Sequence, residues 1–145
     1  MKLSTKTRYG VRLMVDLACR YGEGPVFLRD IAIREAISEK YLSQIVIPLR
    51  KAGLLQSVRV AHGGYSLAGP PAVITLGEII GPLEGISPVD CLENPSACDR
   101  VPVCAARDIW AMLGGKIAEA LNSVTLRDLA EISLKKAEND LSRCI

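Results

Sequence analysis

The sequence predicts a mainly α fold with a small β-wing (α+β), in which a winged helix–turn–helix is followed by a long C-terminal dimerisation helix. Three observations lead to this prediction. The first half of the chain contains three short segments with helical periodicity, and a tight turn separates the last two. An alternating segment with a Gly-Gly pair follows, which is typical of a β-hairpin. The second half contains a long amphipathic stretch with one apolar stripe.

The first helix is expected over residues 4–21. Ser4 or Thr5 can cap it, because a hydroxyl there accepts a hydrogen bond from a free backbone N–H. An apolar stripe at i, i+4 spacing comprises Tyr9, Leu13 and Leu17. Cys19 lies within this helix and is interpreted as a small buried hydrophobic residue. The sequence "GEGP" then ends the helix, and "PVFL" is expected to be extended.

The second and third helices are expected over residues 29–36 and 39–52. Ser38 is a suitable N-cap for the third helix, and Gly53 is a typical residue at which a helix stops. Pro48 lies deep within the third helix, where it removes one backbone hydrogen bond and clashes with the preceding turn. We therefore expect a kink or an early end at Pro48.

Residues 54–69 alternate with a period of two and predict the wing hairpin. Val58 and Val60 lie on one face of the first strand. Gly63-Gly64 is expected to supply a turn with positive φ, after which Tyr65 and Leu67 begin the return strand.

Three more helices are expected at 75–83, 105–124 and 125–139. The first and third begin with a Thr-x-x-acid capping box, Thr75 to Glu78 and Thr125 to Asp128. The apolar stripe of the long middle helix comprises Trp110, Leu113, Ile117, Leu121 and Val124. A Gly-Gly pair at 114–115 costs this helix about 1–2 kcal/mol of propensity, which a close approach of another backbone would explain.

Composition indicates one domain, or one small domain with a dimerising appendage. Hydrophobic residues make up 49% of the chain and aromatic residues only 4%, so the core must be aliphatic. The N-terminus lacks the pattern of a signal peptide, and no apolar run approaches the roughly 20 residues of a membrane span, which predicts a cytoplasmic protein that does not interact with membranes. The expected division is a winged-helix domain at 1–83, a cysteine-containing loop at 84–104, dimerisation helices at 105–139 and a tail at 140–145.

Charge is divided unevenly along the chain. Residues 1–69 carry eleven Lys and Arg against five Asp and Glu, a net charge of +6, whereas residues 70–145 carry seven against eleven, a net charge of −4. A basic winged-helix half predicts a polyanionic partner, double-stranded DNA, for that half alone. Chance segregation of surface charge and a winged helix used only for protein contacts are the alternatives.

The candidate DNA-binding residues follow from the expected fold. The exposed face of the third helix would present donors and one aromatic ring to base edges and phosphates. The end of that helix, the wing and the start of the first helix would contribute phosphate or minor-groove contacts. The full set is Thr7, Arg8, Lys40, Tyr41, Ser43, Gln44, Arg50, Arg59, His62, Gly63 and Gly64.

An enzyme is not expected. The single histidine, His62, lies on the predicted wing, which excludes His-dependent triads and the HExxH zinc motif. The pair Gly115-Lys116 lacks the upstream glycine and the Ser or Thr of a P-loop.

Three of the five cysteines lie in "VDCLENPSACDRVPVC", residues 89–104, with the spacing Cys91-x6-Cys98-x5-Cys104. The absence of a Cys-x2-Cys pair argues against a zinc ribbon or a thioredoxin-type motif. Three thiolates from one loop could hold an iron–sulfur cluster. Spacing alone supports a cluster and three unligated thiols equally, and two such thiols could form a redox disulfide.

The segments "MKLSTKTRYGVRLMVDLA", "ISEKYLSQIVIPLRKAGLLQSVRVAHGGYSLA" and "ITLGEII", followed by three spaced cysteines, resemble the IscR/NsrR/CymR family of winged-helix transcription regulators over about residues 1–135. The resemblance, closest to the IscR-like iron–sulfur branch, implies a homodimer joined by the long helix and bound to a near-palindromic operator. It implies that Cys91, Cys98 and Cys104 ligate one cluster per protomer, a 2Fe–2S rather than a 4Fe–4S cluster. The implied function is a repressor of iron–sulfur cluster biogenesis or related stress genes.

The sequence departs from the family pattern at the fourth ligand. Arg107 stands where the IscR branch carries histidine, and Arg8 stands where NsrR-like members carry an acidic ligand; a guanidinium cannot ligate iron. The fourth ligand would then be Asp108, another carboxylate, a small thiol or water, and a 4Fe–4S cluster with an open iron is an alternative. The alternative function is a cluster-free thiol/redox or nitric-oxide-responsive repressor. Without a cluster, the loop is expected to be mobile and to lack regular structure.

Overall fold

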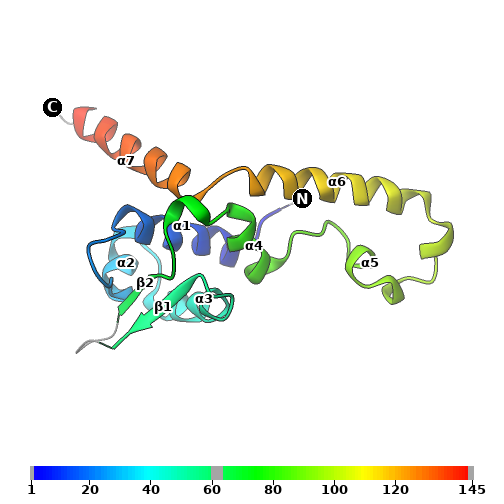
Figure 1. The fold of residues 1–145 in the computed structure, drawn as a ribbon, viewed down its shortest axis with the longest axis horizontal. Helices are drawn as coiled ribbons and strands as arrows, with labels where there is room; N and C mark the ends of the chain where they lie inside the picture. Colours follow the sequence, from blue (N-terminus) through cyan, green and yellow to red (C-terminus); the bar gives the residue numbers. More distant parts are fainter. Residues whose placement is uncertain (1, 60–63, 144–145) are drawn as a thin grey trace.

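The computed structural model describes residues 2–59 and 64–143, and it has the predicted mainly helical architecture with a two-stranded antiparallel wing (Figure 1). The winged-helix half comprises α1 (Thr5–Cys19), α2 (Leu28–Glu35), α3 (Glu39–Lys51), β1 (Leu55–Val58), β2 (Gly64–Leu67), the 3-10 turn η1 (Pro71–Val73) and α4 (Leu76–Glu84). The second half comprises α5 (Asp90–Glu93), the 3-10 turns η2 (Pro95–Ala97) and η3 (Val101–Val103), α6 (Ala105–Asn122) and α7 (Leu126–Arg143). No helix in the described part of the chain is long and apolar enough to cross a membrane.

Local capping sets the starts of the helices that carry the site. Ser4 caps α1 by accepting from Thr7 N, and Ser38 caps α3 by accepting from Tyr41 N, both at 3.2 Å. The early end expected at Pro48 does not occur, because α3 continues to Lys51. Proline removes only its own N–H bond, and the Pro48 carbonyl still accepts from Ala52 N at 3.0 Å.

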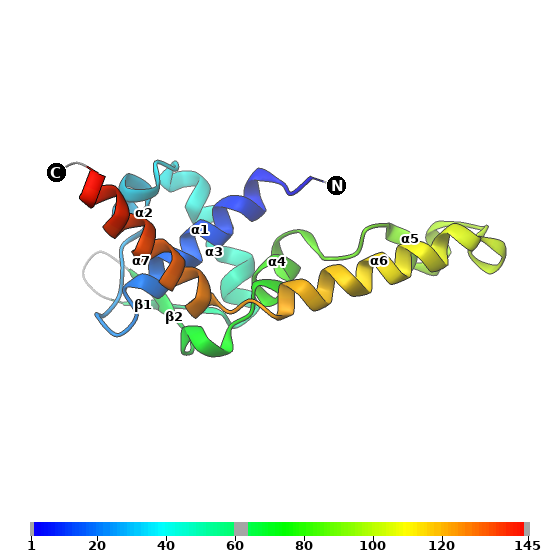
Figure 2. The ribbon, with the colours of Figure 1, turned by 90° about the horizontal axis from the view of Figure 1, so that it is seen from above.

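The core is aliphatic, as the composition predicted, and it lies where α1 crosses α3 and α4. Leu13 of α1, Leu42 of α3 and Ile79 of α4 are completely buried. Helix α7 closes this core from the other side of α1, and its first residue, Leu126, is also completely buried (Figure 2). Helix α7, which was expected among the dimerisation helices, therefore contributes to the winged-helix core of its own chain.

The wing pairs Leu55 with Leu67 at its base and Val58 with Gly64 at its outer end. The "PVFL" segment contributes one bridge, from Val26 to Tyr65. Gly64 does not have the positive φ expected of a turn residue; it begins β2, and a Cβ there would lie 2.8 Å from Pro25 Cβ. Close packing, not turn conformation, therefore explains this glycine, while Val60, His62 and Gly63 lie outside the described residues.

Helices α4 and α7 begin side by side at two matching capping boxes. Thr75 and Glu78 exchange hydrogen bonds, as do Thr125 and Asp128, which confirms both boxes. The two N-caps form an antiparallel bridge. The flanking backbone bonds join Leu76 N to Val124 O at 2.9 Å and Leu126 N to Ile74 O at 2.8 Å. This junction fixes the C-terminal end of α6 to the winged-helix half, and α6 extends away from it (Figure 1).

Candidate nucleic-acid interface and cysteine loop

Helix α3 presents a mainly polar face to solvent, on which Ile47 is the exposed apolar residue, as expected for a recognition helix. Leu42, Ile45, Val46 and Leu49 are buried on its inner face. Lys40, Ser43 and Gln44 are exposed on the outer face, and Tyr41 is half-buried. The Ser43 hydroxyl donates to the Lys40 carbonyl at 2.6 Å, so its one hydrogen-bond donor is already used within the helix. Arg50 is exposed near the end of α3.

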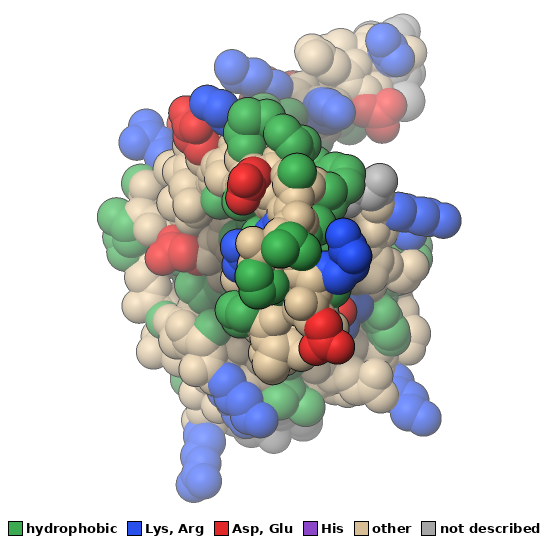
Figure 3. Space-filling model, turned by 90° about the vertical axis from the view of Figure 1, so that its right-hand side faces the viewer, with side chains coloured by type: hydrophobic (Ala, Val, Ile, Leu, Met, Phe, Trp, Pro, Cys, Tyr) green, Lys and Arg blue, Asp and Glu red, His purple; other side chains and the backbone are tan. Residues whose placement is uncertain are grey.

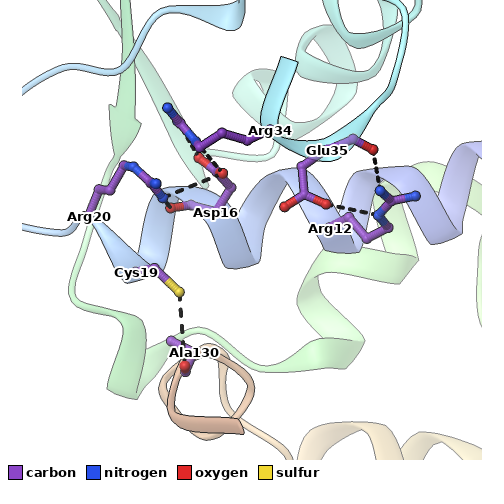
Figure 4. Close-up of polar contacts among 7 residues, drawn as sticks. All are labelled: Arg12, Asp16, Cys19, Arg20, Arg34, Glu35 and Ala130. Atoms are coloured by element: carbon purple, nitrogen blue, oxygen red, sulfur yellow. Dashed lines mark hydrogen bonds and ion pairs between the residues drawn. The ribbon is translucent and has the colours of Figure 1, made fainter. Parts of the chain in front are cut away.

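A buried ion pair fixes α2, the first helix of the helix–turn–helix, against α1 (Figure 4). Arg34 donates from Nε to Asp16 Oδ2 at 2.9 Å and from Nη2 to Oδ1 at 2.8 Å. The Asp16 side chain is only 3% exposed, and Arg20 gives it a second partner at 3.4 Å. The bond to Asp16 raises the pKa of Arg34 above its ordinary value. Two cations thus compensate the burial of one carboxylate.

The turn between α2 and α3 contains a left-handed residue that is not glycine. Ala36 has φ 52° and ψ 46°, and its N–H bonds back to α2. Arg12 of α1 holds the residue before this turn, donating from Nε to Glu35 Oε2 at 3.0 Å and from Nη2 to the Glu35 carbonyl. The helix–turn–helix is therefore attached to α1 by two separate arginine–carboxylate pairs.

The start of α1 differs from the expectation for its two candidate DNA contacts. Arg8 is exposed and donates to Thr5 Oγ1 at 3.1 Å, whereas Thr7 is completely buried. Glu84, at the end of α4, accepts from both Ser4 N and Ser4 Oγ at 3.2 Å. Bonds from the Thr7 hydroxyl and then from Ser4 lower the pKa of Glu84 below its ordinary value. A carboxylate of the same chain thus already lies at the N-terminus of α1.

The wing offers Arg59, which follows β1 directly and is exposed. Gly64 is buried at the start of β2 against Pro25. Of the other wing candidates, His62 and Gly63 lie outside the described residues.

The cysteine loop has more regular structure than the sequence predicted. It contains α5 and the 3-10 turns η2 and η3, and a proline lies in the first residues of each 3-10 turn. Proline fits there because its missing N–H would have no partner at the start of a helical turn. The expectation of a loop without regular structure is therefore wrong.

The structure does not gather the loop cysteines into a metal site. Cys98 is exposed, and Cys91 and Cys104 are half-buried. Over residues 2–59 and 64–143 there is no group of three His, Cys, Asp or Glu side chains that could hold a metal ion. Arg107 donates from Nε and Nη2 to the Cys91 carbonyl at 3.4 and 3.3 Å. As arranged here, the donor set does not fit a bound cluster, and Arg107 fastens the loop to α6 instead.

Cys19 lies apart from the loop, in the contact between α1 and α7. Its Sγ is 3.9 Å from the Ala130 carbonyl (Figure 4). Burial raises the pKa of this thiol, which favours its protonated form. The side chain is half-buried, less than its interpretation as a core residue suggested.

Helix α6 exposes apolar side chains that its own chain does not cover. None of its residues is buried. Ile109, Met112 and Leu113 are 54%, 61% and 42% exposed, and Trp110 is 40% exposed. Hydrophobic side chains gather on the end of the molecule formed by the loop and the start of α6 (Figure 3). By contrast, Ile117, Leu121 and Val124 are half-buried. Gly114 lies against Pro88, where a Cβ would be 3.0 Å from Pro88 Cδ.

The side chains that hold the interface in place could not be identified from the sequence. Asp16, Arg12 and Glu84 gave no signal as motifs, because each finds its partner on a helix distant in sequence. One signal was available for Asp16: it lies next to Leu17 and three residues after Leu13, on the buried side of α1. A carboxylate in that position requires a cationic partner.

Comparison with known proteins gives one family. The model of the Rrf2 family, described as an iron-dependent transcriptional regulator, matches residues 3–132. The HTH-type transcriptional regulator CymR of Bacillus subtilis is 50% identical over 131 residues, which cover 90% of each chain. The solved structure of CymR, titled the global cysteine regulator of B. subtilis, has a TM-score of 0.74 and covers 91% of this chain and 98% of that one, at 47% identity.

Proteins named IscR are also similar. A solved structure named T. potens IscR has a TM-score of 0.73 at 44% identity and covers 97% of this chain and 90% of that one. The HTH-type transcriptional regulator IscR of Vibrio vulnificus is 38% identical over 130 residues, 89% of this chain and 77% of the relative. Identity with the Bacillus CymR thus exceeds identity with the Vibrio IscR, which corrects the expected placement nearest the iron–sulfur branch.

Proposed function

The chain belongs to the Rrf2 family of DNA-binding transcriptional regulators and is not an enzyme, and from this premise we propose that it represses transcription as a homodimer on a near-palindromic operator. The observation that carries this proposal is the polar outer face of α3, held by its buried opposite face and by the ion pairs that fix α2 to α1. In this mode α3 enters the major groove.

The proposed base contacts come from Lys40, Tyr41 and Gln44, because long donors and an aromatic ring suit base edges in the major groove. Arg8, Arg50 and Arg59 are assigned to phosphates or to the minor groove. Ser43 is a weaker candidate for a base contact than the sequence suggested, because its hydroxyl already donates to the Lys40 carbonyl. Thr7 is completely buried, and its hydroxyl accepts a hydrogen bond from Ser4 Oγ, so it is not proposed to contact DNA.

A second chain is proposed to cover the exposed apolar residues of α6. A single chain leaves Ile109, Met112 and Leu113 in water at a position away from the basic half. An apolar helix face of this kind favours a self-complementary contact about a two-fold axis, which would also place two copies of α3 on successive major grooves.

For the signal, we favour the cluster-free reading, in which the thiols of Cys91, Cys98 and Cys104 report redox state. Its support is the absence of a metal-holding group in the described part of the chain and the attachment of Cys91 by Arg107. Similarity to a protein titled the global cysteine regulator adds to this reading.

An iron–sulfur cluster on the same three cysteines, 2Fe–2S in preference to 4Fe–4S, is the second candidate. The iron-dependent description of the family and the similarity to proteins named IscR favour it. The three cysteines would hold such a cluster only if the turns of the loop rearranged, since they do not converge in this structure.

Absorbance and iron content of anaerobically purified protein separate the two readings. A colourless, iron-free protein whose operator affinity changes with oxidation of its thiols supports the thiol reading. Visible bands that each single loop Cys→Ala variant loses, while Cys19→Ala keeps them, support the cluster. DNA binding itself is tested on a random duplex library, from which a repressor of this design must enrich a near-palindrome.

A further inference from the structure

Two aromatic rings link α1 to the start of the recognition helix. Tyr9 lies in the second turn of α1 and Tyr41 in the first turn of α3. The rings meet edge to face, with centroids 5.8 Å apart and an interplanar angle of 87°. This is a favoured geometry for an aromatic pair, because the positive edge of one ring meets the negative face of the other.

One guanidinium extends this contact to the other side of the helix–turn–helix turn. The Arg12 guanidinium carbon lies 5.4 Å from the centroid of the Tyr9 ring. The same group donates to the side chain and the carbonyl of Glu35, the last residue of α2. Arg12 and Tyr9 thus contact the residue before left-handed Ala36 and a ring three residues into the helix after it.

The Tyr41 side chain also lies next to open space. A surface pocket opens beside the two rings, and its walls are Thr5, Tyr9, Ala36, Ile37, Ser38 and Tyr41. A half-buried side chain next to open space can occupy more than one rotamer unless a neighbour selects one. An edge-to-face partner favours one position roughly two- to tenfold.

We propose that Tyr9 and Arg12 are positioning residues for sequence recognition, which set the base preference read by Tyr41 without contacting a base themselves. This proposal rests on the proposed function, because it requires Tyr41 to face DNA. It assigns to α1 a role in specificity beyond its part in the core and any phosphate contact.

A purely structural role would give different results. Arg12 is 45% exposed and Glu35 26% exposed, and an ion pair at the surface contributes little to folding stability. Loss of Arg12 should therefore leave the unfolding midpoint almost unchanged while it alters base discrimination. Tyr9→Phe retains the ring and should keep wild-type base discrimination. Tyr9→Leu retains only apolar contact and should reduce that discrimination.

The experiment is a double-mutant cycle on DNA chosen by the protein itself. Wild-type protein first selects a preferred 30-bp duplex from a random library, and affinities are then measured for that duplex and for each single base-pair change. Tyr41→Ala should reduce discrimination at one or two positions per half-site. Tyr9→Leu should reduce it roughly two- to tenfold at the same positions, and it should add nothing when Tyr41 is already alanine.

Matched variants complete the test. Arg12→Gln should act in the same direction as Tyr9→Leu, and Tyr21→Leu, which removes an exposed tyrosine outside this pair, should leave discrimination unchanged. If Tyr41→Ala leaves base preference intact, the assignment of Tyr41 in the proposed function fails. If Tyr41→Ala alters preference but Tyr9→Leu and Arg12→Gln weaken all duplexes equally or not at all, the positioning proposal alone is overturned. Arg12→Gln decides if Tyr9→Leu does not fold.

Discussion

Asp16 and Arg34 form a two-pronged ion pair between α1 and α2, with both N–O distances below 3 Å and the carboxylate almost completely buried. A second pair, Arg12 with Glu35, joins the same two helices but is less buried, with side chains 45% and 26% exposed. One chain thus offers a buried and an exposed version of the same link.

Removing the cation from the buried pair should destabilise the fold far more than removing it from the exposed pair. Arg34→Ala leaves the Asp16 carboxylate buried with only Arg20 at 3.4 Å, and we expect a loss of about 2–4 kcal/mol. Arg12→Ala should cost about 0–1 kcal/mol. Urea unfolding followed by circular dichroism measures both. Equal losses for the two variants would contradict the assigned importance of burial.

Ala36→Gly should stabilise the protein, although alanine is the better helix former. At φ 52° the alanine Cβ is strained, and glycine relieves this strain at some cost in unfolded-state entropy. We expect a gain of about 0.5–1 kcal/mol. Ala52→Gly is the control, because Ala52 ends α3 at φ −76° and should gain nothing. Thermal unfolding of the two variants side by side checks the sign.

The stability of the fold should decrease in acid partly through Glu84. Its pKa is lowered in the folded state by bonds from Thr7 and Ser4. A carboxyl with a lowered pKa stabilises the fold above its unfolded pKa, about 4.3, and this contribution is lost as pH falls through the folded pKa. Glu84→Gln should therefore flatten the dependence of the unfolding midpoint on pH below about 4.3. Asp128, whose pKa is lowered by bonds from Thr125, adds an effect of the same sign. Glu138→Gln on exposed α7 serves as the charge control.

Charge on the exposed face of α6 should separate the proposed dimer. Leu121 lies on the same apolar stripe, but its Cβ approaches Gly77 of α4, so a change there would also disturb the fold. We therefore expect Met112→Glu with Leu113→Glu to give folded monomers with poor operator affinity. Leu141→Glu, on an exposed part of α7, should remain dimeric. Sedimentation velocity distinguishes these states, and a persistent dimer in the first variant would move the interface elsewhere.

DNA binding should depend strongly on salt. A dimer that neutralises several phosphates in each half-site should give a log–log slope of roughly −4 to −10. Arg59→Ala should make the slope shallower and weaken all sequences alike, whereas Gln44→Ala should also change the preferred base. Fluorescence anisotropy at several salt concentrations measures both, and a slope near zero would argue against DNA as the partner.

Features that depend on neighbouring residues in the sequence could be predicted. Ser38, Thr75 and Thr125 cap their helices as expected, because a cap and its partner lie within three residues. The aliphatic core follows from composition, and the two-stranded wing follows from the alternation of residues along the chain.

Features that depend on contacts between distant segments could not be predicted. Gly64 is needed because a side chain there would collide with Pro25, which is distant in sequence. The partner of Asp16 is Arg34, which lies on another helix. From the sequence, Arg107 is only a residue that cannot ligate iron. Its bonds to the Cys91 carbonyl depend on the packing of α5 against α6, which the sequence does not reveal.

The bridge between Thr75 and Thr125 brings together the two ends of the segment that runs from α4 through the cysteine loop to α6. Helix α4 packs in the core, the cysteine loop and α6 then leave the winged-helix half and return to the start of α4, and α7 resumes the core with Leu126. Topologically, the loop and α6 form an insertion within an otherwise continuous domain. Such an arm can change its length or its chemistry without breaking the chain path of the domain that carries it. Different loops could therefore be exchanged on one winged-helix scaffold, with the capping boxes at Thr75 and Thr125 as the fixed boundary.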